Sequence, residues 1–327
     1  MSAKNRKLGR SDIAVSAVGF GCWAIGGPFT SGGKPAGWGA VDDDESVAAI
    51  DKALELGVTF FDTADVYGVG HSERVLGRAL AGRRDDVVIA TKFGNTFDVA
   101  TRNLTGTDTS PDYVRAACAA SLERLGTDRI DLYQLHVGDL PLDRVDDLLA
   151  TLESLVDEGK IRAYGWSTDD PERAAAFAAG DHCAAVQHQL NVLDDAPDML
   201  VVCADHDLAS VNRGPLAMGL LSGKYSAETT LGVDDVRGDS PDWMRYFTDG
   251  RPDPAWLRKV SAIRDVLTSD GRTLAQGALG WILARHGATV PIPGCRTVRQ
   301  AEENAGVLTT GPLTPAAMAE IAGLVNA

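Results

Sequence analysis

An α/β fold, a single closed (β/α)8 barrel spanning residues 1–327, is the architecture that this sequence predicts. Eight short apolar segments alternate with eight longer helical segments, an order typical of parallel strands covered by helices. No proline- or glycine-rich linker divides the chain, so we expect one domain. A doubly wound open sheet with the same order of elements is the alternative.

Strands are predicted where nearly continuous apolar runs occur, because strands of a parallel sheet are buried on both faces. Several of these runs end in a polar residue, which places that residue at the carboxyl edge of the sheet. The predicted strands are residues 17–21, 59–62, 87–91, 130–136, 163–167, 185–189, 209–213 and 289–292.

Helices are predicted from apolar spacing and from capping residues. Leu148, Leu152 and Leu155 recur at three- and four-residue steps and form one apolar face. Ser110 followed by Pro111 is typical of an N-cap with proline in the first turn. The predicted helices are residues 44–56, 72–80, 111–125, 142–158, 171–179, 195–207, 275–285 and 297–307.

Two segments interrupt this alternation. Residues 26–40 form a long, flexible loop after the first predicted strand, and residues 222–254 form a longer one after the seventh. Both follow the carboxyl ends of strands, where a barrel carries its active site. Long connections in compact domains are commonly lids or binding loops, so we expect these two to border the site.

The composition excludes several classes of protein. The chain contains 46 acidic against 31 basic residues, a formal net charge of −15. A nucleic-acid-binding protein needs a basic surface that releases phosphate counterions, and an anionic membrane would repel this chain. The five cysteines lack a Cys-x-x-Cys spacing, and the sequence shows no apolar leader and no spanning segment. We therefore expect a cytoplasmic protein with reduced thiols.

Familiar local motifs are absent or stand in the wrong context. Gly19, Gly21 and Ala24 match a dinucleotide-binding pattern, but glycine and proline follow where its helix should begin. No H-E-x-x-H or G-x-S-x-G motif occurs, and the six histidines share no ligand spacing. The sequence therefore predicts neither a metal site nor a serine hydrolase.

Four ionisable residues stand at or just beyond the ends of neighbouring predicted strands. Asp62, Lys92 and His136 close the second, third and fourth strands, and Tyr67 lies in the loop after the second. If the barrel is formed, all four meet at the same edge. Their convergence favours a catalytic group over four separate structural residues.

These four side chains have a shared chemistry. A free tyrosine has a pKa of about 10 and is a slow acid at neutral pH. A nearby lysine favours the phenolate, and a buried aspartate keeps that lysine charged. Histidine can orient a carbonyl group, and with tyrosine it can stabilise the oxyanion that forms as hydride arrives.

The sequence resembles the aldo-keto reductase superfamily, in particular its bacterial, channel-β-subunit-like branch of general oxidoreductases. The match runs from KLGRSDIAVSAVGFG to VPIPGCRTVRQAEENAG, nearly the whole chain. The resemblance implies a barrel that binds a nicotinamide cofactor without a Rossmann domain and an N-terminal hairpin that plugs the barrel. It also implies a catalytic tetrad of Asp62, Tyr67, Lys92 and His136, with Tyr67 as the proton donor.

The resemblance further implies which residues hold the cofactor. Ser167 and Gln187 stand where relatives bind the carboxamide, whereas Thr168 replaces the usual asparagine and its hydroxyl can supply only one of the two amide contacts. Arg213 stands where relatives often place an aromatic or small residue. The implied contacts at and after the strands are Gly21, Cys22, Trp23, Asp62, Ser167, Gln187, Arg213, Pro215, Leu216, Gly219, Leu220, Ser222 and Lys224.

The last segment resembles the family's adenosine clamp. Arg296 offers a planar fork for a ribose 2′-phosphate and favours NADPH. Gly294 stands where many NADPH-specific members have lysine, so NADH stays an alternative cofactor. The implied contacts of this segment are Gly294, Arg296, Thr297, Gln300, Glu303 and Asn304.

The substrate pocket is predicted from aromatic residues in the loops at the same edge, because such pockets bury a ligand against aromatic surface. The pocket residues predicted are Trp23, Tyr67, His136, Trp243 and Phe247.

Three functions fit this reading. The first is NADPH-dependent reduction of an aldehyde, ketone or open-chain sugar. The second is an NAD(P)-dependent sugar or alcohol dehydrogenase working in the oxidative direction, which needs the same tetrad. The third is a cofactor-sensing subunit with slow turnover. Substrate identity and oligomeric state stay open.

Overall fold

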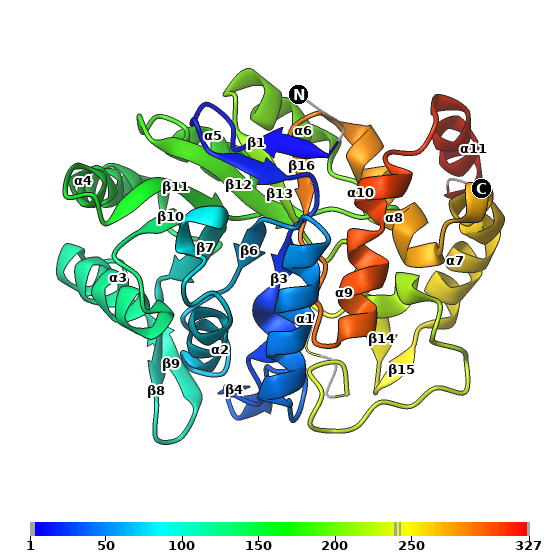
Figure 1. The fold of residues 1–327 in the computed structure, drawn as a ribbon, viewed down its shortest axis with the longest axis horizontal. Helices are drawn as coiled ribbons and strands as arrows, with labels where there is room; N and C mark the ends of the chain where they lie inside the picture. The colour runs from blue at the N-terminus through cyan, green and yellow to red at the C-terminus, as the bar shows by residue number, and fades with distance from the viewer. Residues whose placement is uncertain (1–3, 239–240, 242, 326–327) are drawn as a thin grey trace.

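The computed structural model describes residues 4–238, 241 and 243–325, and it confirms the predicted barrel (Figure 1). Its main sheet has eight strands, and all neighbouring strands run parallel. In spatial order they are β3 (Phe20–Gly21), β6 (Phe60–Asp62), β7 (Val88–Phe93), β10 (Ile130–Leu135), β11 (Ile161–Ser167), β12 (Cys183–Gln189), β13 (Ala209–Arg213) and β16 (Thr289–Pro291).

The first and last strands of this sheet meet, which closes the barrel. Gly21 forms a parallel bridge with Gly294, and its amide donates a hydrogen bond to the Pro293 carbonyl over 3.0 Å. A Cβ on Gly21 would lie 2.7 Å from the Ile292 carbonyl oxygen, so glycine is required for this approach. Closure excludes the open-sheet alternative.

The predicted helices are all present outside the strands (Figure 1), with some ends shifted by two or three residues. The fourth is shorter than predicted because its first turn, Leu142–Arg144, is a 3-10 helix. The matching helices are α1 (Asp43–Glu55), α2 (His71–Ala79), α3 (Pro111–Leu125), α4 (Val145–Asp157), α5 (Pro171–Phe177), α6 (Pro197–Asp205), α8 (Leu274–Arg285) and α9 (Val298–Ala305).

Three further helices lie outside the predicted set: α7 (Pro254–Leu267), α10 (Val307–Thr310) and α11 (Pro315–Val325). The Asp253 carboxylate caps α7 by accepting hydrogen bonds from the amides of Ala255 and Trp256. With proline at its first position, α7 begins with the same signal that predicts α3.

The two long connections contain ordered strands, which corrects their description as loops alone. Residues 26–40 include β4 (Thr30–Ser31) and β5 (Lys34–Pro35), which join the hairpin of β8 (Asn95–Asp98) and β9 (Asn103–Thr107) in a four-stranded sheet. Residues 222–254 include β14 (Phe247–Thr248) and its antiparallel partner β15 (Arg251–Pro252). Positions 239, 240 and 242 of this segment lie outside the described residues.

The N-terminal hairpin plugs the amino end of the barrel. Strands β1 (Asn5–Lys7) and β2 (Ala14–Ser16) pair antiparallel, and they lie at the opposite end of the molecule from β8 and β9 (Figure 1). Leu8, Ile13 and Val15 are buried in one apolar cluster with residues of the barrel strands. This packing seals the amino end and leaves the carboxyl end as the accessible face.

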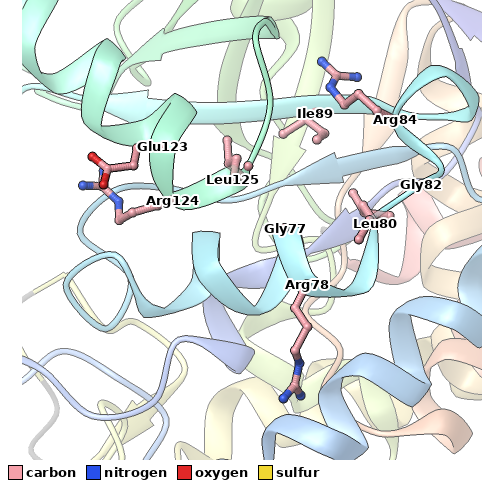
Figure 2. A pocket seen from close by; sticks show the side chains of 11 residues that line it. Gly77, Arg78, Leu80, Gly82, Arg84, Ile89, Glu123, Arg124 and Leu125 are labelled. Carbon is pink, nitrogen blue, oxygen red and sulfur yellow. The ribbon is translucent and has the colours of Figure 1, made fainter.

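A small cavity of about 290 Å³ lies between α2 and α3, outside the barrel (Figure 2). The helices approach closely at Gly77, where a Cβ would lie 2.6 Å from the Leu125 carbonyl oxygen. Its three arginines, Arg78, Arg84 and Arg124, each pair with a carboxylate. The cavity therefore offers no spare cation for a ligand.

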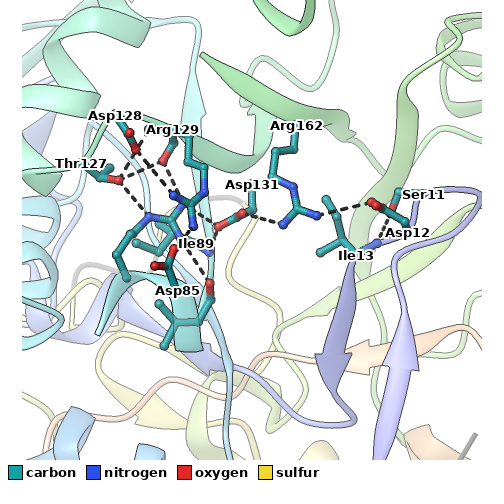
Figure 3. A network of polar contacts seen from close by, with 12 residues as sticks. Ser11, Asp12, Ile13, Asp85, Ile89, Thr127, Asp128, Arg129, Asp131 and Arg162 are labelled. Atoms are coloured by element: carbon teal, nitrogen blue, oxygen red, sulfur yellow. Dashed lines mark hydrogen bonds and ion pairs between the residues drawn. The ribbon is translucent and has the colours of Figure 1, made fainter. Parts of the chain in front are cut away.

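A buried charge network ties the amino ends of the strands to the hairpin (Figure 3). The Asp131 side chain is 1% exposed, and its two oxygens accept hydrogen bonds from Arg84, Arg162 and the Ile89 amide over 2.7–3.0 Å. Arg162 also reaches Asp12 of the hairpin over 3.3 Å. Because a buried carboxylate needs this full set of donors, the network holds β7, β10 and β11 in register.

Among the described residues, no helix has the length and apolar character needed to cross a membrane.

Candidate active site

A cavity of about 800 Å³ lies at the carboxyl ends of the strands. Its floor is formed by the ends of β3, β6, β11, β12 and β13, and its sides by the two long connections and α9. Parallel strands deliver their terminal side chains to one edge, which explains why residues far apart in sequence meet here.

Three of the four predicted catalytic residues line this cavity: Asp62, Tyr67 and His136. Lys92 lies directly behind them and is fully buried. Its Nζ donates hydrogen bonds to Asp62 Oδ1 over 2.5 Å, to the Thr63 carbonyl over 2.8 Å and to the Tyr67 hydroxyl over 3.3 Å. The structure thus brings the four residues together.

Local structure positions Tyr67 above Lys92. After β6 ends at Asp62, the chain turns so that the Tyr67 amide donates to the Ala64 carbonyl over 3.2 Å. Gly68 continues the turn in a left-handed conformation, and a Cβ there would lie 1.7 Å from the Gly26 carbonyl oxygen. The turn therefore needs glycine directly after the tyrosine.

The electrostatic environment keeps Lys92 charged and Tyr67 protonated. Burial is the largest single effect and lowers the Lys92 pKa, but the Asp62 carboxylate and the Tyr67 hydroxyl together outweigh it, and the net pKa is raised. Burial raises the Tyr67 pKa, and the opposing charge of Lys92 does not cancel that effect. As expected from the sequence, Lys92 favours the phenolate, but burial has the larger effect and the net Tyr67 pKa is raised.

His136 is neutral at physiological pH. Burial lowers its pKa well below the ordinary value, and the positive charges of Lys92 and Arg213 lower it further. Its ring lies edge-on to Tyr67, with centroids 5.8 Å apart. Among the described residues its buried Nδ1 has no hydrogen-bond partner. A neutral imidazole beside a phenol can donate one hydrogen bond to a carbonyl oxygen.

Most residues expected at the cofactor line the same cavity, in a continuous path from the tetrad to α9. These residues are Gly21, Cys22, Trp23, Asp62, Ser167, Gln187, Arg213, Pro215, Leu216, Gly219, Ser222, Lys224, Gly294, Arg296, Gln300, Glu303 and Asn304.

Three residues considered for the cofactor, Thr168, Leu220 and Thr297, are not among those that line the cavity. Leu220 is buried in the core behind the cavity wall, and Thr297 caps α9 by accepting a hydrogen bond from the Gln300 amide over 3.2 Å. The Thr168 hydroxyl donates to the Gly138 carbonyl over 3.0 Å and accepts from the Asp170 amide over 3.2 Å. Thr168 is buried, and its hydroxyl already has two partners within the protein.

The cavity lining includes groups that suit phosphates. These are two cationic side chains and a serine: Lys224, Arg296 and Ser222. The Arg296 amide donates to Gln300 Oε1 over 3.0 Å, while its guanidinium donates to the Trp38 carbonyl over 3.1 Å. Two cations and a hydroxyl in one pocket fit the anionic half of a dinucleotide.

Arg213 extends from the end of β13 into the cavity. It pairs with Asp169 and donates to Gln189 Oε1 over 3.3 Å. These partners hold the guanidinium on the side of the cavity that includes Tyr67 and His136, and its charge acts on both groups.

Aromatic residues cover the outer part of the cavity. Trp23 lies 5.1 Å from Trp38, 6.0 Å from Tyr67 and 6.3 Å from Trp243, measured between ring centroids. Phe247, expected in this wall, does not line the cavity.

Phe247 is instead 1% exposed and packs edge-on against Tyr225 at 5.3 Å. Its strand, β14, turns the ring into the core, whereas the neighbouring Tyr246 lines the cavity. The Tyr246 hydroxyl accepts hydrogen bonds from Gln189 and Asn191.

Two residues that sequence reasoning missed complete the site. Gln134 donates to Asp62 Oδ2 over 2.9 Å. Arg237 lines the cavity, binds Asp235 with two nitrogens, and donates to the Met218 carbonyl over 3.0 Å. Gln134 is detectable as a polar residue at an inward position of an apolar strand, two residues before His136. Arg237 had no such signal because its segment lacks periodicity.

Within the described part of the chain, no cluster of three or more His, Cys, Asp or Glu side chains has a geometry that would hold a metal ion. The five cysteines are buried and unpaired by disulfides.

Comparisons with known proteins agree with this geometry. The sequence model of the Aldo/keto reductase family matches residues 17–326. The aldo-keto reductase yakc of Schizosaccharomyces pombe, whose name specifies NADP(+), is 32% identical over 319 residues, covering 94% of this chain and 87% of that protein. The glycerol dehydrogenase AKR11B4 from Gluconobacter oxydans has a TM-score of 0.84 at 29% identity, covering 99% of this chain and 96% of that one.

An aldo/keto reductase from Klebsiella pneumoniae, solved in complex with NADP and acetate, has a TM-score of 0.69 at 28% identity, covering 98% of this chain and 95% of that one. The family match spans all eight barrel strands and the four residues at their ends. The chain therefore belongs to the aldo/keto reductase family.

Proposed function

We propose that this protein is an NADPH-dependent carbonyl reductase that acts on an aldehyde, a ketone or an open-chain sugar, with Tyr67 as the proton donor. The observation that carries the proposal is the Tyr67 hydroxyl held 3.3 Å from the buried Lys92 ammonium at the floor of the cavity. This contact stabilises the phenolate that remains after Tyr67 has given up its proton.

The chain's own residues act on the substrate carbonyl. The Tyr67 hydroxyl and the neutral His136 ring face the same part of the cavity, so both can donate a hydrogen bond to one carbonyl oxygen. As negative charge develops on that oxygen, Tyr67 transfers its proton. Asp62 keeps Lys92 charged throughout.

The residues that line the cavity fit a nicotinamide dinucleotide. Ser167 and Gln187 would hold the carboxamide, and Ser222 and Lys224 would hold the phosphates. Arg296 would bind the 2′-phosphate, which supports NADPH over NADH. When bound, the cofactor supplies the hydride.

The proposal is tested by tryptophan fluorescence titration with NADPH and with NADH, followed by a turnover screen against aldehydes, ketones and sugars. Trp23 and Trp38 line the cavity, so a bound nicotinamide should quench their emission. We expect tighter binding of NADPH than of NADH and oxidation of NADPH by a carbonyl substrate. Binding of neither cofactor would overturn the proposal.

A second candidate is the oxidative direction, as an alcohol or polyol dehydrogenase. The structural similarity to a protein named glycerol dehydrogenase favours it. The two candidates are separated by measuring kcat/KM for an alcohol with NADP(+) and for its carbonyl product with NADPH at the same pH. A higher value with the alcohol would support the second candidate.

A further inference from the structure

The Asp62 carboxylate is held by two buried glutamines as well as by Lys92. Gln134 Nε2 donates to Asp62 Oδ2 over 2.9 Å, and Gln187 Nε2 donates to the same oxygen over 2.8 Å. Both glutamines are nearly inaccessible to solvent. Asp62 Oδ1 is occupied by Lys92. Each carboxylate oxygen therefore has an assigned donor.

These residues form one layer of the barrel. Asp62, Gln134 and Gln187 come from the second, fourth and sixth strands, and alternate strands contribute the side chains of one layer in such barrels. The layer below is apolar, with Leu132 on the same strand as Gln134. A polar side chain is therefore placed at an inward position where an apolar one would pack equally well.

Hydrogen-bonding partners on both sides, Asp62 and Gln134, orient the Gln187 amide. An ionised carboxylate only accepts hydrogen bonds, so the NH2 group of each glutamine must face Asp62. The Gln187 NH2 group also donates to Gln134 Oε1 over 3.2 Å, which uses both of its hydrogens. Gln187 lines the cavity, and among the described residues no donor contacts its Oε1. Gln187 therefore presents its amide oxygen, rather than its NH2 group, to the cavity.

We propose that Gln134 is a positioning residue that, together with Asp62, fixes this orientation of Gln187 and thereby makes the site selective for a cofactor with an amide N–H donor. The inference rests on the proposed function, because it assumes a nicotinamide carboxamide at Gln187. Gln134 supplies the acceptor for the second Gln187 hydrogen. Without that acceptor, the Gln187 side chain loses one of the two contacts that hold it.

The carboxamide of NADP(+) has two N–H hydrogens, whereas its 3-acetylpyridine analogue replaces the NH2 group with methyl. An amide oxygen presented by Gln187 distinguishes the two by one hydrogen bond, worth roughly tenfold in affinity. We expect the protein to bind NADP(+) about tenfold more tightly than the analogue, as measured by quenching of tryptophan fluorescence.

Gln134→Leu removes the acceptor and one donor to Asp62 while filling a similar volume. The preference for NADP(+) over the analogue should fall to about threefold or less in this variant, because Gln187 keeps only one of the two contacts that fix its amide. Leu132→Met is the matched control: it perturbs packing on the same strand without removing a hydrogen bond, and it should keep the full preference.

Gln134→Glu provides a second variant in case Gln134→Leu does not fold. A protonated glutamic acid can donate to Asp62 and accept from Gln187, whereas its ionised form repels Asp62. The preference for NADP(+) should therefore be kept at low pH and lost as pH rises, a pH dependence that the wild-type protein lacks.

The outcomes separate the inference from the function on which it depends. If the wild-type protein binds neither NADP(+) nor its analogue, the proposed function fails. If it binds both equally, or if a folded Gln134→Leu variant keeps the full preference, the proposed function stands and the role of Gln134 is overturned.

Discussion

The Lys92 ammonium lies 3.3 Å from the Tyr67 hydroxyl, and Asp62 holds it there through a contact of 2.5 Å. Because Lys92 is buried, its charge is little screened by water and acts mainly on these two partners. Tyr67 is therefore protonated before the reaction, and the Lys92 cation stabilises the phenolate that forms when Tyr67 gives up its proton.

Tyr67→Phe should lower kcat for carbonyl reduction by about 10²–10⁴-fold, because it removes the proton donor without changing the shape of the site. Cofactor affinity should change by less than about twofold, since the ring stays in place. Steady-state rates and a fluorescence titration check both points. A variant that retains wild-type turnover would rule out Tyr67 as the donor.

Arg296→Ala should weaken NADPH binding by about tenfold or more and NADH binding much less, because only NADPH carries a 2′-phosphate. The guanidinium also holds the Trp38 carbonyl, so a small common loss for both cofactors is expected. Arg299→Ala, which removes an exposed arginine three residues later, in α9, serves as the control. Equal losses for both cofactors would contradict the assigned role.

Asp131→Ala should reduce the free energy of unfolding by about 3–5 kcal/mol, because it leaves Arg84 and Arg162 without their buried partner. Asp85→Ala removes an exposed acid from the same network and should cost less than about 1 kcal/mol. Urea denaturation measures both. Cofactor affinity should be unchanged in Asp131→Ala, since the network lies at the amino end of the barrel.

The free energy of unfolding should fall as pH decreases from about 6.5 to about 4. In this range His188 is protonated in the unfolded chain but stays neutral in the folded protein. Burial lowers the pKa of His188 to about 4. Its Nδ1 donates to the Gln189 carbonyl over 3.0 Å and its Nε2 lies 2.7 Å from the Ser210 hydroxyl, which together fit the neutral ring.

The folded-state pKa of His188 lies below its unfolded value. The stability that His188 contributes is therefore present in full above pH 6.5 and is lost as pH falls toward 4, a change of roughly 3 kcal/mol in the free energy of unfolding. His188→Gln should flatten the dependence of unfolding free energy on pH over this range. His206→Gln, at a half-buried position, should leave it unchanged. If the slope of unfolding free energy against pH is the same in His188→Gln as in the wild-type protein, the role given to His188 is contradicted.

The alternation of strands and helices, the four polar residues at strand ends and the acidic surface follow from the sequence. Strand and helix periods are local, and a barrel directs every strand end to one face. Asp62, Tyr67, Lys92 and His136 could therefore be selected together before any contact was known. The Asp253–Pro254 cap of α7 carried an equally local signal, but it lay at the end of a segment without periodicity.

Only the tertiary structure decided the features that depend on partners distant in the chain. Phe247 turns into the core because β14 pairs with β15, and no local pattern distinguishes it from Tyr246. The Thr168 hydroxyl is occupied by a carbonyl from another loop. The orientation of the Gln187 amide follows from Asp62 and Gln134, which are 125 and 53 residues away. The sequence specifies local conformation and burial. Closure of the barrel decides which polar groups come within hydrogen-bonding distance, and those partners set the direction of each hydrogen bond.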